Sequence, residues 1–111
     1  MTQPTVDDLA LKELRAIMGE DFQLLVDTFV QDSQVRIESI KQAIEGLDAE
    51  ALRVAAHSFK GSALNLSAGK LTELCRQLEQ KGRDGTLEGA AQILMDIRTE
   101  YDAVRAHLRA E

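Results

Sequence analysis

The sequence predicts an all-α protein: an antiparallel four-helix bundle with a short additional helix at its N-terminus. Apolar residues recur three or four positions apart rather than alternating, which is typical of amphipathic helices and not of strands. The 111 residues include one proline and only 4% aromatic residues, and short glycine-containing breaks separate the periodic segments. Short connections between long helices place neighbours antiparallel. The whole chain, residues 1–111, is therefore expected to form a single helical domain.

The boundaries of the helices follow from the residues that interrupt the apolar periodicity. Asp48 is placed to cap the third helix and Thr86 to cap the last one. In chain order, the expected helices cover residues 6–18, about 21–46, 49–66, the segment from 70 to the GRDG sequence at 82–85, and the segment from 87 onward.

Composition excludes several classes of protein. With 44% hydrophobic and 29% charged residues, the chain has an ordinary globular composition. The single cysteine, Cys75, has no partner for a disulfide or a metal site and is expected to be a small core residue. The net charge of −6 disfavours nucleic acid as a partner. No apolar run reaches the length of a membrane span, and residues 1–8 lack the features of a signal peptide. We expect a cytoplasmic monomer that binds neither nucleic acid nor membranes.

His57 is predicted to face away from the core. At about 100° of rotation per residue, it lies roughly 140° from the apolar stripe of its helix. A lone histidine at such a position is most often a solvated side chain. His107, between Val104 and Leu108 on the last helix, is expected to be a solvated or partly buried histidine. The residues of the apolar stripe are Leu52, Ala55, Ala56, Phe59, Ala63 and Leu66.

Three features around His57 favour a functional interpretation. Gly61 lies one helical turn further on, so no side chain stands beside the imidazole at that point. Lys60 is close enough to reach an anion attached to the ring. Val54 and Leu64 are apolar residues on the same outward face, as expected of a docking surface. Together these residues predict an exposed histidine at the centre of a partner-binding face.

The residue types around His57 point to a phosphoryl carrier. A neutral imidazole is nucleophilic near pH 7 and can accept a phosphoryl group covalently. The chain has no phosphate-binding loop and no room for a nucleotide-binding domain. Phosphoryl transfer depends on positioning, on Mg²⁺ and on carboxylates, which a partner would have to supply. We therefore expect no metal site, no cofactor and no autonomous enzymatic activity in this chain.

The sequence AHSFKGSALNLSAGKL, followed by LCRQLEQKGR, resembles the signature of histidine-containing phosphotransfer (HPt) domains of multistep phosphorelays. The match is strongest over residues 56–82, and length and helix order extend it to nearly the whole chain. The resemblance implies that His57 is phosphorylated on Nε2, that Lys60 supports the phosphoryl group and that Gly61 leaves space for the partner. In some members of the family a glutamine on the next helix orients the imidazole. The spacing here places Glu79 near that position with Gln80 adjacent, and leaves open which of them has the role.

The resemblance also implies the partners. They are the receiver domains of hybrid sensor histidine kinases and of response regulators, whose active sites contain a cluster of carboxylates. Residues 53–83 contain six basic and two acidic residues, a net charge of +4, whereas the remainder of the chain carries −10. A locally basic face suits an acidic partner. The residues expected to dock the partner are Arg53, Val54, Leu64, Arg76, Gln80 and Arg83.

Three other classes of function are less well supported. A passive adaptor would bind receiver domains without carrying phosphate, and His57 would then be dispensable. An enzyme that used His57 as a general base would need a pocket and a second polar group directed at the ring. A dimeric kinase core is disfavoured because the chain has no ATP-binding part and one chain completes the bundle.

Overall fold

The computed structural model describes residues 5–109, and these residues form five α-helices. The outermost residues of the predicted domain, 1–4 and 110–111, lie outside the described range. The helices are α1 (Asp8–Met18), α2 (Asp21–Glu45), α3 (Ala49–Asn65), α4 (Gly69–Asp84) and α5 (Ala90–Arg109).

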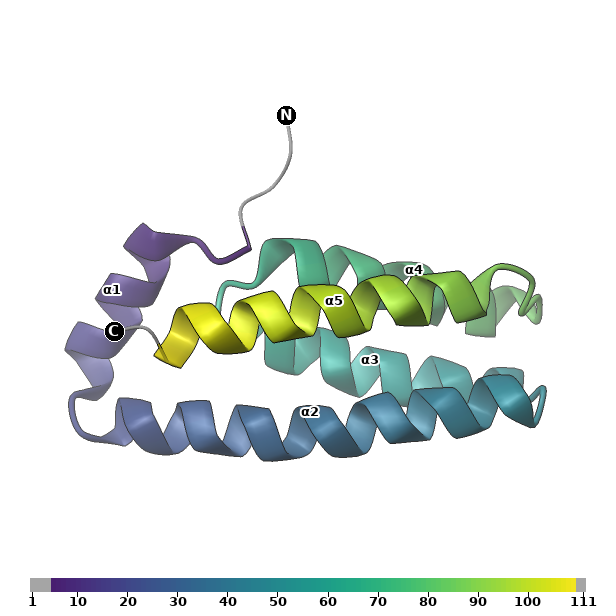
Figure 1. Ribbon diagram of the computed structural model, residues 1–111, viewed down its shortest axis with the longest axis horizontal. Coiled ribbons are helices and arrows are strands. Elements are labelled where there is room, and N and C mark those ends of the chain that lie inside the picture. The colour runs from purple at the N-terminus through teal and green to yellow at the C-terminus, as the bar shows by residue number, and fades with distance from the viewer. Residues whose placement is uncertain (1–4, 110–111) are drawn as a thin grey trace.

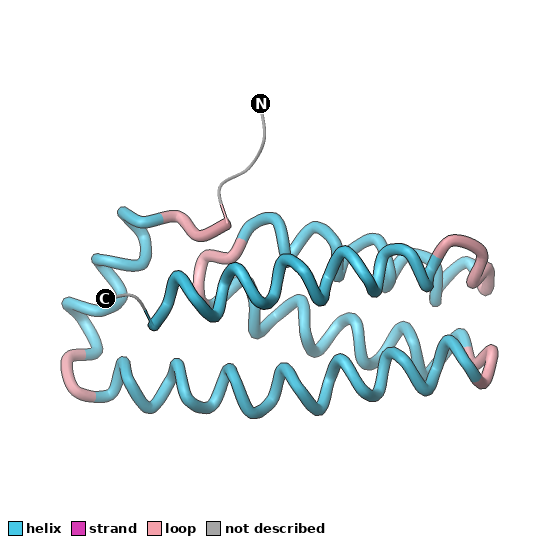
Figure 2. Tube along the Cα trace, in the orientation of Figure 1, coloured by secondary structure: helices cyan, strands magenta, loops and turns pink. Residues whose placement is uncertain are grey.

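Helices α2 to α5 form the bundle, and α1 lies across one of its ends (Figure 1). In the ring of four helices, α2 contacts α3 and α5, and α4 contacts the same two helices. The loops that join the bundle helices lie at its two ends (Figure 2). The all-α class, the four-helix bundle and the additional N-terminal helix are all confirmed. None of the described helices is both long and apolar enough to cross a membrane.

Helix α3 supplies much of the core, and it packs most extensively against α4. All six residues of the predicted stripe are buried, and Phe59 is the largest of the fully buried side chains. Three of the six are alanines, whose small side chains allow neighbouring helices to approach α3 closely. The close pairing of α3 with α4 brings the outward side of α3 beside side chains from α4.

Of the two helix caps predicted from the sequence, one is confirmed and the other is wrong. Asp48 caps α3 as expected, with its Oδ1 accepting a hydrogen bond from the backbone N–H of Ala51 at 3.0 Å. The prediction that Thr86 caps the last helix is wrong, because α5 begins only at Ala90. Gly89 has a φ of 80°, in the left-handed region, so the helix cannot extend back through it.

The start of α1 is attached to the loop between α3 and α4. Val6 is buried, and the backbone N–H of Asp7 donates to the carbonyl of Ser67 at 3.0 Å. Asp7 also caps the helix through a hydrogen bond from the N–H of Ala10. Residue 6 is therefore an anchor that precedes α1 rather than its first residue.

Candidate functional site

His57 lies in the middle of α3, on the side turned away from the bundle core. Its side chain is 62% exposed, whereas Ala56 and Phe59 on the core-facing side are fully buried. The outward position predicted from the helical period is confirmed. The imidazole is thus accessible to a second protein.

The imidazole is held from the neighbouring helix by Glu79. Nδ1 of His57 lies 2.9 Å from Oε2 of Glu79, whose side chain is only 4% exposed. Of the two residues that the sequence leaves open, Glu79 faces the ring. Gln80 is exposed and donates instead to Asp84 at 2.9 Å. A glutamate therefore stands where the resemblance places a glutamine.

The charge state of Glu79 determines which ring nitrogen is free. The hydrogen bond from Lys60, followed by the one from His57, lowers the pKa of Glu79 against the raising effect of burial. Glu79 is consequently a carboxylate at neutral pH and can only accept hydrogen bonds. Nδ1 of the neutral His57 ring must then carry the proton, and the lone pair lies on Nε2.

Glu79 accepts hydrogen bonds from two cations as well as from His57. Nζ of Lys60 lies 2.5 Å from Oε1, and Nη2 of Arg83 lies 3.1 Å from Oε2. Lys60 is near the ring as predicted. Arg83 was predicted only to dock a partner, but its guanidinium contacts the oxygen that His57 also contacts. The buried carboxylate is the centre of the site.

Two positions near the site, Gly61 and Gly82, are occupied by glycine for different structural reasons. A Cβ atom on Gly61 would have no neighbouring atom within 4 Å, so close packing within this chain does not require glycine there. A Cβ atom on Gly82 would lie 2.7 Å from the carbonyl oxygen of Ala49 and from the backbone nitrogen of Arg53. Gly82 allows α3 and α4 to approach, whereas Gly61 leaves open space on the surface of the same helix as His57.

The predicted docking residues are all at the surface, but the face is less basic than the count over residues 53–83 indicates. Val54 and Leu64 are 50% and 64% exposed. Arg53 donates two hydrogen bonds to Glu50, a residue just outside that count. Arg76 does the same with Glu73. Glu73 is already part of the count of +4, so only the pairing of Arg53 with Glu50 lowers the net charge of the face, from +4 to +3.

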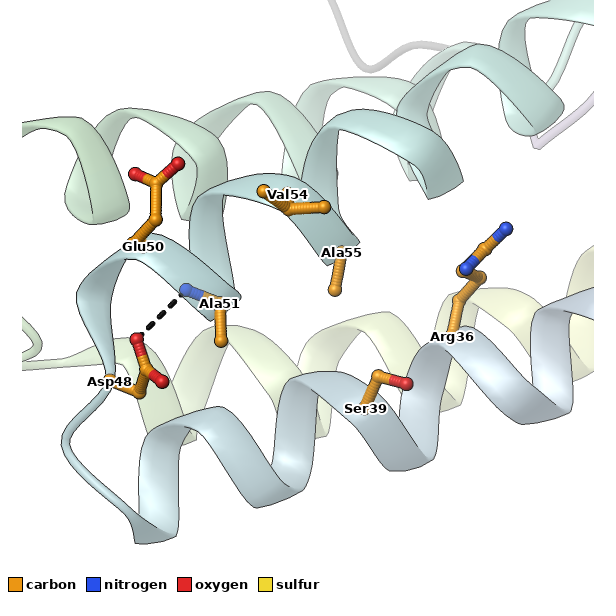
Figure 3. A pocket seen from close by; sticks show the side chains of 7 residues that line it. All are labelled: Arg36, Ser39, Asp48, Glu50, Ala51, Val54 and Ala55. Atoms are coloured by element: carbon orange, nitrogen blue, oxygen red, sulfur yellow. Dashed lines mark hydrogen bonds between the residues drawn. The ribbon is translucent and has the colours of Figure 1, made fainter.

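A groove between α2 and α3 adjoins the exposed face and was not found from the sequence. Its volume is about 590 Å³, and Val54 lies on its α3 side (Figure 3). Arg36 and Ser39 project toward it from α2 (Figure 3). Helical periodicity identifies the outward side of each helix but does not show which side chains of two helices meet. The sequence therefore does not predict that Arg36 and Ser39 line a groove with α3.

The other candidates identified from the sequence have no part in the site. Cys75 is buried, and burial raises the pKa of its thiol to about 12, which leaves it unreactive. His107 lies at the end of α5, where its Nε2 is 2.6 Å from Oδ1 of Asp8. Within residues 5–109, no group of three or more His, Cys, Asp or Glu side chains is arranged to hold a metal ion.

Comparison with known proteins identifies the family. Residues 24–107, a range that contains the whole site, match the Hpt domain. The chain belongs to the Hpt domain family. The fold is similar to the crystal structure of histidine-containing phosphotransfer protein B (HptB) from Pseudomonas aeruginosa PAO1, with a TM-score of 0.93 and 37% sequence identity. That alignment covers 98% of this chain and 95% of the HptB chain. No curated protein sequence matched significantly.

Membership of the Hpt domain family establishes the general function. The chain is a histidine phosphotransfer protein of phosphorelay signalling. Hpt domains are phosphoryl carriers and interact with receiver domains.

Proposed function

We propose that His57 carries the phosphoryl group on Nε2. The observation that supports this most strongly is the hydrogen bond between its Nδ1 and the buried carboxylate of Glu79. This bond fixes the proton on Nδ1 and leaves Nε2 as the nucleophile. The open space beside Gly61 would admit the active site of a partner to within bonding distance of the ring.

Transfer from a receiver to this chain would proceed by in-line displacement at phosphorus. The lone pair of Nε2 forms the new N–P bond, while the P–O bond to the receiver aspartate breaks and its electron pair returns to the aspartate carboxylate. The ring gains positive charge and its Nδ1 proton stays on the hydrogen bond to Glu79. Transfer to a response regulator is the reverse reaction, with neutral imidazole as the leaving group.

Lys60 would stabilise the phosphoryl group after transfer. Its ammonium has three donors and uses one of them on Oε1 of Glu79. Another donor can meet a phosphoryl oxygen without loss of the ion pair. Glu79 would therefore position two groups at once: the ring that accepts the phosphoryl group and the cation that supports it.

The proposed partners are receiver domains of hybrid sensor histidine kinases and of response regulators. Such a partner would contact Val54 and Leu64 around His57, and the groove with Arg36 would extend the contact onto α2. We propose that the receiver supplies Mg²⁺ and the acidic residues for the chemical step, and that this chain acts as a carrier rather than as an enzyme.

Incubation of the purified chain with a phosphorylated receiver tests the proposal. We expect label to move to the chain and the chain to pass it to a second receiver. A passive adaptor would form a complex but take up no label, and His57→Gln would not alter its behaviour. Loss of labelling in His57→Gln with retained receiver binding would support the carrier function and reject the adaptor.

A further inference from the structure

Arg83 differs from the other exposed arginines of the site because it contacts the carboxylate that holds His57. Its guanidinium and Nδ1 of His57 share Oε2 of Glu79, at 3.1 Å and 2.9 Å. The side chain of Arg83 is 58% exposed, whereas that of Lys60, on the other oxygen, is 29% exposed. Arg83 is the more accessible of the two cations on Glu79.

We propose that Arg83 is a positioning residue that couples receiver docking to the reactivity of His57. In the free protein its guanidinium occupies Oε2 of Glu79. When a receiver binds, an acidic side chain of the receiver draws the guanidinium away, and Oε2 then accepts a hydrogen bond from His57 alone. The inference rests on the proposed function, because it requires His57 to be the acceptor and a receiver to be the partner.

Electrostatics determines the direction of the effect. As Nε2 bonds to phosphorus, positive charge develops on the imidazole, and a negative charge at Oε2 stabilises it. A guanidinium on the same oxygen opposes this, because it offsets part of the carboxylate charge. The other charged side chains around Glu79 stay in place: Lys60 is on Oε1, and Arg53 is bound to Glu50. Removal of Arg83 should therefore increase the reactivity of the free protein.

The ion pair of Arg83 with Glu79 is also easy to exchange. It joins residues four apart on α4, with the arginine side largely in solvent, and such pairs contribute little to stability. A carboxylate of a docked partner offers the guanidinium an equivalent pair, so the exchange does not leave a buried charge unpaired: Glu79 keeps Lys60 and His57.

Arg76 provides a matched control. It lies two turns before Arg83 on α4, its side chain is 53% exposed, and it is bound by Glu73 rather than by Glu79. Arg76→Gln therefore removes the same charge from the same surface without altering the carboxylate that holds His57. Arg83→Gln and Arg76→Gln should both fold, because both side chains are exposed, and circular dichroism checks this.

The experiment compares phosphorylation without and with a partner. Phosphoramidate is the small donor: Nε2 bonds to phosphorus while the P–N bond of the donor breaks and ammonia leaves with its electron pair. We expect Arg83→Gln to react about two to five times faster than wild type. Arg76→Gln should match wild type with this small donor, because the reaction involves no docked receiver and Arg76 does not contact Glu79. With a saturating phosphorylated receiver, Arg83→Gln and wild type should transfer equally fast, because docking has already displaced Arg83 in wild type. The ¹⁵N chemical shift of Nδ1 in free Arg83→Gln should match that of wild type bound to a receiver carrying beryllofluoride.

Three results would overturn the inference. Slower reaction of Arg83→Gln with phosphoramidate, or faster loss of its phosphate, would mean that Arg83 binds the phosphoryl group directly. A rate and a Nδ1 shift equal to those of wild type would mean that Arg83 is only a surface residue. Equal acceleration in Arg76→Gln would indicate a general charge effect. His57→Gln in the same assay tests the proposed function separately, since labelling of that variant would reject His57 itself.

Discussion

The two histidines of this protein each pair with a carboxylate, but the pairs have opposite arrangements. At His57 the ring is exposed and the carboxylate of Glu79 is buried, with side-chain exposures of 62% and 4%. At His107 the ring is 32% exposed and the carboxylate of Asp8 is 72% exposed. The nitrogen in contact also differs: it is Nδ1 in His57 and Nε2 in His107.

These differences favour His57 over His107 as the proposed phosphoryl carrier. A buried carboxylate has a fixed position and holds the ring of His57 in one orientation, with Nε2 unblocked. Asp8 is solvated and is the first residue of α1, and it is in contact with Nε2 of His107. An accessible ring on a fixed acceptor can be approached in line by a partner.

Replacement of the two histidines should give opposite results. His57→Gln should reduce phosphoryl acceptance from a receiver to background, because Nε2 of the other histidine, His107, is in contact with Asp8. His107→Gln should accept phosphate at the wild-type rate. Both variants should have the same helical content as the wild type and nearly the same thermal unfolding temperature. Acid-labile phosphate on folded His57→Gln would remove His57 from the site.

A bulky side chain beside His57 should prevent a receiver from approaching but should leave the imidazole accessible to a small phosphoryl donor. Gly61→Gln should slow transfer from a receiver about 100-fold, because it fills space that the receiver must enter. Reaction with phosphoramidate should change little. Gly61→Ala serves as the control for folding and should stabilise the helix by up to ~1 kcal/mol, since its Cβ meets no other atom. Transfer to Gly61→Gln at the wild-type rate would leave the glycine unexplained.

Replacement of Glu79 should slow phosphoryl transfer, whereas replacement of Asp8 should not. Glu79→Leu removes the acceptor for Nδ1 and should slow transfer about 100-fold, whereas Glu79→Gln keeps an amide oxygen that can accept and should lose about 10-fold or less. Asp8→Asn should have no effect on transfer. Single-turnover rates with one receiver measure all three variants. If Glu79→Leu transferred as fast as Asp8→Asn, the buried carboxylate would not position the ring.

Acid should destabilise the protein through Glu79. The pKa of Glu79 is lowered from its ordinary value of 4.5 in the folded state, chiefly by the hydrogen bond from Lys60. Its contribution to stability is therefore fully present above about pH 4.5 and is lost as the pH falls through the lower folded-state pKa. Urea unfolding of wild type and Glu79→Gln from pH 7 to pH 3 measures this. The difference in unfolding free energy should shrink on acidification, and a constant difference would contradict the assignment.

Helical periodicity was sufficient for the fold and for the direction of His57, since both depend on which residues share a face. It was not sufficient for Glu79, because the choice between Glu79 and Gln80 depends on the rotation of α4 against α3. The sequence identifies Gly82 only as part of a helix end, whereas in the structure it allows the backbones of α3 and α4 to approach each other closely. The pairing of Arg53 with Glu50 likewise depends on side-chain conformation, so a count over residues 53–83 leaves this carboxylate out.

Locating the phosphoryl group on the chain tests directly whether His57 is its carrier. After transfer from a phosphorylated receiver to ¹⁵N-labelled protein, correlation of phosphorus with the imidazole nitrogens by NMR identifies both the residue and the atom. We expect a single phosphoryl group on Nε2 of His57, with Nδ1 of the same ring still hydrogen-bonded to Glu79. Phosphate on His107, or on Nδ1 of His57, would contradict this assignment.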